Sequence, residues 1–137
     1  MKLESDMGIR KIDYMMTDLD DKVMETMAFT GCGYMMRKKR FIELGKCWEQ
    51  LGRWGNTGAE WALKIWLSGG RVLVHRDVIC GHLFRNQYIK GHDESITKMG
   101  MQLLGSRFQC MKGPEQIYPL NWLGHRFNNE RYNLQCR

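Results

Sequence analysis

The sequence predicts an α/β fold in which a short mixed sheet packs against helices. Three observations lead to this prediction: helical spacing of apolar residues over 59–68, alternation over 71–75, and a run of aromatic and small residues over 26–36. A chain of 137 residues has room for one domain with a single hydrophobic core. The expected organisation is therefore a lead-in over 1–25, one domain over 26–127 and a polar tail over 128–137.

The first predicted elements lie near the N-terminus. Residues 1–25 are acidic, rich in methionine and weakly patterned, so we expect an irregular or helical lead-in. Residues 26–36 suit a strand, because the glycines among their aromatic residues allow close approach of another backbone or of a ligand. Residues 37–44 then switch to helical spacing, and Gly45 is a candidate C-cap.

Residues 45–58 cannot form a regular element, because they contain four glycines and glycine is unfavourable inside both helices and strands. The same stretch contains Trp48 and Trp54. Loops on a rigid scaffold often carry binding sites, so one interpretation is a loop that contacts a ligand. The alternative is a surface turn anchored by buried tryptophans, and the residues alone favour neither.

Residues 59–68 form the most strongly predicted helix. Apolar side chains cover most of its circumference, so the helix should be largely buried. Glu60 and Lys64 remain polar, and their order and four-residue spacing favour an ion pair of about 0.3–0.5 kcal/mol if it is exposed. Two glycines end the helix, and residues 71–75 return to the alternation of a strand.

The C-terminal part of the chain predicts two more helices. Residues 94–104 can form the first of them, and Gly113 and Pro114 then break the chain. Pro119 suits the first turn of a short final helix over 119–127.

Composition and charge narrow the classes of function. The net charge of +6 favours polyanions or phosphate-bearing ligands, but the basic residues are scattered and no RNA-binding motif occurs, which argues against nucleic acid as the partner. No apolar run reaches the ~20 residues that a membrane-spanning helix needs, and the N-terminus lacks the apolar core of a secretory signal.

Five cysteines without a Cys-x-x-Cys pair point to reduced thiols. These observations lead us to expect a cytoplasmic protein that does not enter the membrane.

Three motifs occur in order between residues 25 and 85. They are ETMAFTGCGYMMRKKRFIELG, WGNTGAEWALKIWLSGG and CGHLFR. Together they resemble the acceptor-side half of family-two glycosyltransferases of the GT-A fold. The run is similar to small bacterial and phage members and, more distantly, to the polypeptide N-acetylgalactosaminyltransferases. The resemblance implies a partial GT-A fold that lacks most of the N-terminal nucleotide-binding half.

The resemblance also implies a function, the transfer of a sugar from a nucleotide-sugar donor to a hydroxyl-bearing acceptor. In this fold a divalent metal, Mn²⁺ or Mg²⁺, acts as a Lewis acid on the diphosphate. The chain has no room for the half that carries the family's Asp-x-Asp motif, so the expected partner is a complementing N-terminal half or a second copy of the chain. That partner would cover the helix of 59–68, and the isolated chain should expose apolar surface. The alternative function is a non-catalytic carbohydrate- or polyanion-binding module derived from this fold.

Several candidate site residues follow from the resemblance. His82 matches the imidazole that completes the metal site, and Arg85 matches a position near the diphosphate. Trp54 matches a tryptophan at the mouth of the sugar pocket, where an indole face can stack on a sugar ring. Gly55 and Asn56 follow it as further substrate contacts. For His82, Arg85 and Trp54 the structural alternatives are a strand-end cap, an exposed arginine and simple core packing.

Two carboxylates complete the predicted site. An inverting transferase needs a base to accept the proton of the acceptor hydroxyl, and Glu60 is the candidate catalytic residue. The alternatives are that Glu60 positions the acceptor or only pairs with Lys64. Glu49 is a candidate substrate contact, because Trp48 stands where relatives often carry an acidic residue and Glu49 is the acid that remains beside it.

Overall fold

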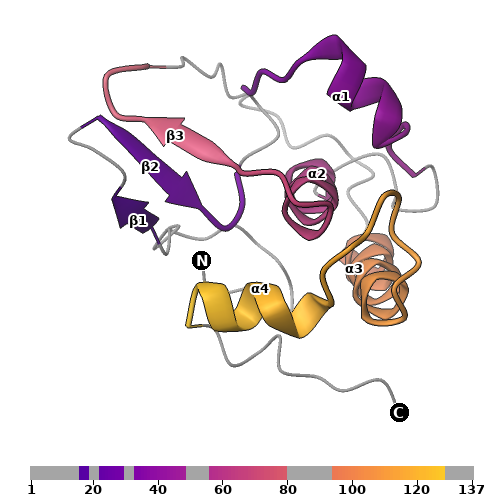
Figure 1. The fold of residues 1–137 in the computed structure, drawn as a ribbon. Coiled ribbons are helices and arrows are strands. Elements are labelled where there is room, and N and C mark those ends of the chain that lie inside the picture. Colours follow the sequence, from indigo (N-terminus) through magenta and orange to yellow (C-terminus); the bar gives the residue numbers. More distant parts are fainter. Residues whose placement is uncertain (1–15, 19–21, 30–32, 49–55, 80–93, 129–137) are drawn as a thin grey trace.

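The computed structural model describes residues 16–18, 22–29, 33–48, 56–79 and 94–128. It confirms the predicted α/β class (Figure 1). In chain order the described elements are β1 (Met16–Asp18), β2 (Val23–Thr26), α1 (Lys38–Glu43), α2 (Thr57–Leu67), β3 (Leu73–His75), α3 (Glu94–Gln109) and α4 (Leu120–Arg126).

The three described strands form one small sheet in the order β1-β2-β3. Both strand pairs are antiparallel, with Met16 opposite Thr26 in the first pair and Val23 opposite His75 in the second. The predicted strand over 26–36 was placed too late, because β2 already ends at Thr26. The prediction of an irregular or helical lead-in was also wrong where the structure describes it, since β1 and most of β2 lie before residue 26.

The physical reason for this error is an acid inside β2. Glu25 lies in the middle of the sheet and is buried, which a strand pattern does not predict for a carboxylate. Its charge is compensated by Arg126, whose Nη2 lies 2.5 Å from Oε2, and by Arg71, whose Nη1 lies 3.7 Å from Oε1. Both arginines are distant from Glu25 in sequence. The burial of this carboxylate in a strand is therefore compensated only once the chain has folded.

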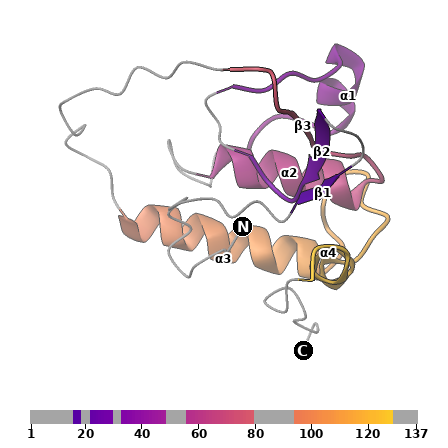
Figure 2. The same ribbon diagram turned by 90° about the vertical axis from the view of Figure 1, so that its left-hand side faces the viewer.

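The helix α2 lies at the centre of the molecule. Figures 1 and 2 show α3 running alongside α2, while α4 lies crosswise to both. The indole Nε1 of Trp66 donates a hydrogen bond of 3.0 Å to the carbonyl of Thr26, which ties α2 to the end of β2. The core cluster draws on every helix except α1 and consists of Met27, Ala28, Ala62, Leu63, Trp66, Leu67, Val72, Leu104, Phe108, Leu120, Leu123 and Phe127.

The chain already covers α2 by itself. Trp61 and Trp66 are 0% and 1% exposed, so the prediction that a missing half is needed to cover this helix was wrong. Exposed apolar side chains do occur, but they lie elsewhere: Ile42 on α1 and Val78 and Ile79 after β3 are among them.

The ends of the helices agree with the glycine and proline signals, with one exception. Gly45 follows α1 with a φ of 73°, as expected for a C-cap, and α4 begins directly after Pro119. The exception is α3, which passes through Gly105 and continues to Gln109, five residues beyond the predicted end. Burial of Leu104 and Phe108, both 0% exposed, offsets the cost of about 1 kcal/mol for a glycine inside a helix.

A short segment after α3 joins the C-terminal ends of α2 and α3. The side-chain amide of Gln116 donates hydrogen bonds to the carbonyls of Phe108 and Tyr118, at 2.8 and 2.9 Å. The carbonyl of Leu67 at the end of α2 accepts bonds from the N–H groups of Ile117 and Tyr118. These bonds hold α4 in place against α2. Within the described part of the chain, no helix is long and apolar enough to cross a bilayer.

Candidate functional site

The clearest polar feature inside the protein is an ion pair on α2. Glu60 and Lys64 are 1% and 0% exposed, and Lys64 Nζ lies 2.5 Å from Glu60 Oε1. The predicted pairing at four-residue spacing is therefore confirmed. The pair is buried rather than exposed, which changes its energetics, because removing two charges from water is unfavourable unless further hydrogen bonds compensate for it.

The compensating bonds come from the chain just before α2. The backbone N–H of Trp48 donates to Glu60 Oε1 at 3.0 Å, and Lys64 Nζ donates to the carbonyl of Lys46 at 2.7 Å. Lys64 Nζ also lies 4.9 Å from the ring centroids of both Trp48 and Trp61. A cation near aromatic rings gains further attraction when it is desolvated. The two charges are thus satisfied by each other, by backbone groups and by aromatic rings.

Trp48 connects this ion pair to α3. Its ring centroid lies 5.5 Å from that of Phe108 and 4.3 Å from the guanidinium carbon of Arg107. Trp48 is half-buried and packs against the core cluster. Trp48 therefore packs between the buried ion pair and α3.

Two titratable groups lie near Glu60. Burial raises the pKa of the Cys47 thiol, the charge of Glu60 raises it further, and the Trp61 indole N–H and the Lys64 ammonium partly oppose these effects. Burial also raises the pKa of the Tyr34 hydroxyl, with smaller contributions from Cys47 and then Glu60. Cys47 is exposed, but its thiol is less easily ionised than a free one, so it is a poor nucleophile near neutral pH.

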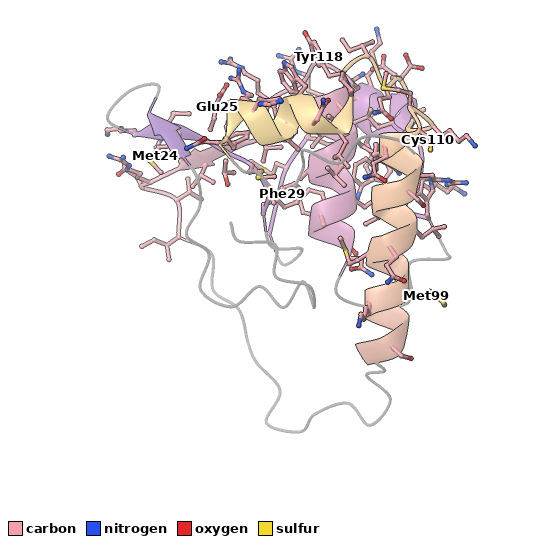
Figure 3. All side chains as sticks on the ribbon, turned by 90° about the horizontal axis from the view of Figure 1, so that it is seen from below. Met24, Glu25, Phe29, Met99, Cys110 and Tyr118 are labelled. Atoms are coloured by element: carbon pink, nitrogen blue, oxygen red, sulfur yellow. The ribbon has the colours of Figure 1, made fainter. Side chains whose placement is uncertain are left out.

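A second buried carboxylate, Glu25, lies beside α4 (Figure 3). Arg126, which binds it, also lies over the ring of Trp66, with its guanidinium carbon 5.1 Å from the centroid. This cluster joins β2 to α2 and α4. The sequence analysis did not predict this cluster. One signal was present: Glu25 lies shortly before the apolar residues Met27 and Ala28 at the start of the first motif.

The structure brings together two of the seven predicted site residues. Asn56 is the N-cap residue of α2 and is 2% exposed, and its carbonyl accepts the N–H of Glu60 at 2.9 Å. The other five lie outside the described residues: Glu49, Trp54, Gly55, His82 and Arg85. Their roles stay predictions.

The expected metal has no site within the described part of the chain. No three His, Cys, Asp or Glu side chains come close enough there to hold a metal ion.

Part of the chain is similar to three proteins that are named as N-acetylgalactosaminyltransferases. The chain is 41% identical over 64 residues to the probable N-acetylgalactosaminyltransferase 8 of Caenorhabditis elegans. Over stretches of the same length it is 34% identical to the putative polypeptide N-acetylgalactosaminyltransferase 13 of Drosophila melanogaster and 28% identical to the polypeptide N-acetylgalactosaminyltransferase 3 of Mus musculus. No protein-family model and no solved structure matches.

The extent of these matches limits what they show. They cover 47% of this chain but only 15%, 12% and 10% of the three relatives, respectively. The activity of the whole relatives is therefore a proposal for this chain. What the comparisons do show is that about half of the chain is similar to part of the polypeptide N-acetylgalactosaminyltransferases, which are GT-A glycosyltransferases.

Proposed function

We propose that this chain is the acceptor-side half of a GT-A glycosyltransferase, which transfers a sugar from a nucleotide-sugar donor to a hydroxyl-bearing acceptor. The observation that carries the proposal is the 64-residue similarity to three proteins named as N-acetylgalactosaminyltransferases. Their names make UDP-N-acetylgalactosamine the first donor to test. The α/β fold, with its small sheet packed against helices, is compatible with half of such a domain.

The proposal assigns the binding of donor and metal to the second and third motifs. His82 would contribute an imidazole to a divalent metal, Mn²⁺ or Mg²⁺, and Arg85 would contact the diphosphate. Trp54, Gly55, Asn56 and Glu49 would contact the sugar or the acceptor. The metal would supply Lewis-acid stabilisation of the leaving diphosphate.

Calorimetry with the full chain tests this assignment. We expect UDP-N-acetylgalactosamine at millimolar concentration to bind only when Mn²⁺ is present, and His82→Ala to abolish the dependence on metal. His125→Ala is the matched control, because His125 is exposed in the last turn of α4. Absence of binding by the unaltered chain at millimolar donor would contradict the assignment of donor and metal contacts to His82 and Arg85.

Turnover is expected only when the nucleotide-binding half is supplied. The partner that we propose is a complementing N-terminal half, because the resemblance is to the acceptor-side half of the fold, or a second copy of the chain. Light scattering across a concentration series would reveal self-association. An assay with added N-terminal half from one of the relatives would test complementation.

One observation favours a second function, a non-catalytic module that binds carbohydrate or polyanions. The helix α1 has no buried residue, has no acid in its first turn, and exposes Lys38 and Lys39. Such a surface attracts anionic polymers through contacts that weaken with salt. Salt-sensitive binding of an acidic glycan that is indifferent to Mn²⁺ would favour this function over the transferase.

A further inference from the structure

Glu60 contacts residues that lie on both sides of the stretch 49–55. Its carboxylate accepts the N–H of Trp48 at 3.0 Å, and its own N–H donates to the carbonyl of Asn56 at 2.9 Å. The two partners are described residues that border the stretch at either end. The carboxylate of Glu60 therefore fixes the backbone at Trp48, while its N–H makes the first hydrogen bond of the helix to Asn56, as the backbone of any non-proline residue there would.

We propose that Glu60 and Lys64 act together as a positioning pair, which sets the place and direction of the backbone at residues 46–48 relative to the first turn of α2. This inference concerns described atoms and does not require a reaction. Its consequence for substrate rests on the proposed function: the predicted contact Glu49 directly follows Trp48, and the predicted contact Asn56 is itself bonded to the backbone of Glu60.

The direction of the backbone is fixed because the pair offers both polarities of hydrogen bond. The carboxylate of Glu60 accepts an N–H at residue 48, while the ammonium of Lys64 donates 2.7 Å to the carbonyl of Lys46. A neighbouring strand would offer an acceptor and a donor to the backbone in the same way. Here the side chains of Glu60 and Lys64, whose charged atoms lie 2.5 Å apart, supply the acceptor and the donor instead.

Stability alone does not account for this pair. A buried ion pair is often no more stable than two apolar side chains of similar volume. Glu60 and Lys64 lie beside Trp61 and Leu63, which are buried apolar residues, so apolar side chains would suit the surroundings. Apolar replacements could fill the space, but they could neither accept the N–H of Trp48 nor donate to the carbonyl of Lys46. What the charges add is a defined geometry.

The positioning role differs from that of a catalytic base. Oε1 of Glu60 is already engaged by Lys64 and by the N–H of Trp48, and the residue is 1% exposed. A base must give its carboxylate to a substrate hydroxyl, so its function is lost when the carboxylate becomes an amide. A positioning residue needs only an oxygen acceptor, which the amide of Glu60→Gln retains.

Amide hydrogen exchange of the full chain, measured by NMR without any ligand, tests the proposal. We expect the Trp48 amide to be protected in the unaltered chain. In Glu60→Gln its protection relative to core amides of the same variant should stay within threefold of the unaltered chain, because loss of the buried charge pair lowers the stability of all amides together. The double variant Glu60→Met/Lys64→Met should fold with similar stability, yet lose at least tenfold of the protection at Trp48. Glu43→Gln is the control, because Glu43 makes an i,i+4 contact with Lys39 on the exposed face of α1.

Two outcomes would overturn the positioning role. One is unchanged protection of the Trp48 amide in the folded double variant. The other is a loss in Glu60→Gln as large as in the double variant. If the double variant does not fold, Glu60→Gln/Lys64→Met replaces it. This variant leaves no buried charge and keeps an oxygen that can accept the N–H of Trp48, so loss of the protection at Trp48 in it would overturn the positioning role.

A binding experiment separates this inference from the proposed function. With UDP-N-acetylgalactosamine and Mn²⁺, we expect Glu60→Gln to bind within threefold of the unaltered chain and the double variant to bind at least tenfold more weakly. Equal binding by the double variant would overturn the link between positioning and substrate. Failure of the unaltered chain to bind would contradict the donor and metal assignment of the proposed function, while the exchange experiment would still decide the positioning role.

Discussion

Removal of the positive charge from the buried pair on α2 should destabilise the protein strongly. In Lys64→Met the carboxylate of Glu60 stays buried and loses the ammonium that lies 2.5 Å away. Breaking a buried pair in this way costs about 3–5 kcal/mol, because the remaining charge is uncompensated. A domain of this size has a total stability of about 5–15 kcal/mol, so the expected loss is a large share of it.

The double variant Glu60→Met/Lys64→Met should recover most of that loss. It leaves no buried charge, and apolar side chains of similar volume often match an ion pair in stability. The double-mutant cycle should therefore show a coupling energy of about 3 kcal/mol or more, which is large for two residues in contact. Lys39→Met is the matched control: its side chain is 89% exposed and its partner Glu43 is 3.9 Å away, so the expected change is below about 0.5 kcal/mol.

Urea denaturation followed by tryptophan fluorescence would measure these changes, since two of the five tryptophans, Trp48 and Trp61, lie beside Lys64. The reasoning fails if Lys64→Met costs less than about 1 kcal/mol, because a loss that small is typical of an exposed pair. It also fails if the double variant is as unstable as the single one. That result would mean that the bonds to the backbone, rather than the charge, dominate the stability.

Two further predictions concern a pair of glycines and a thiol. A Cβ at Gly113 would lie 2.3 Å from the ring of Phe108, so Gly113→Ala should lower the thermal midpoint of unfolding by at least a few degrees. A Cβ at Gly105 would meet open space within α3, so Gly105→Ala should raise the free energy of unfolding by up to about 1 kcal/mol. Equal effects of the two substitutions would contradict the packing described. For Cys47, the folded thiol has a raised pKa, so its contribution to stability is complete below the unfolded value of about 8.5 and is lost as the pH rises through the folded value. Alkylation at a series of pH values, read out by peptide mass spectrometry, should give a higher midpoint for ionisation of the Cys47 thiol in the folded chain than in the chain unfolded in urea, and this midpoint should move down in Glu60→Gln. A folded midpoint at or below the unfolded one would refute the assignment.

Most of the helices could be predicted from local sequence. The periodicity of apolar residues placed a helix at 59–68, and the structure has α2 at Thr57–Leu67. Gly45 and Pro119 marked the end of α1 and the start of α4 because a left-handed turn and a fixed φ are properties of single residues. These features depend on neighbours within one turn of helix, so they can be read without knowledge of the rest of the chain.

The errors have a different origin. A carboxylate in the middle of β2 argued against a strand, and only Arg71 and Arg126 make it acceptable. The predicted helix over 94–104 stopped before Gly105, whereas α3 continues through it to Gln109, where burial of Leu104 and Phe108 supports the helix. In both cases a local signal was overridden by partners that the folded chain supplies.

The candidate site shows the same division. The spacing of Glu60 and Lys64 on one face of α2 followed from the sequence alone, because four residues make about one turn of a helix. Their burial, and the bonds that make it tolerable, came from residues up to 18 positions earlier. The carboxylate of Glu25 and the guanidinium of Arg126 meet across 101 positions. The sequence by itself thus determined where helices form and which residues share a helical face, since these depend on local backbone geometry. Only the tertiary structure decided which charges are buried and what holds them, because that depends on contacts between distant segments.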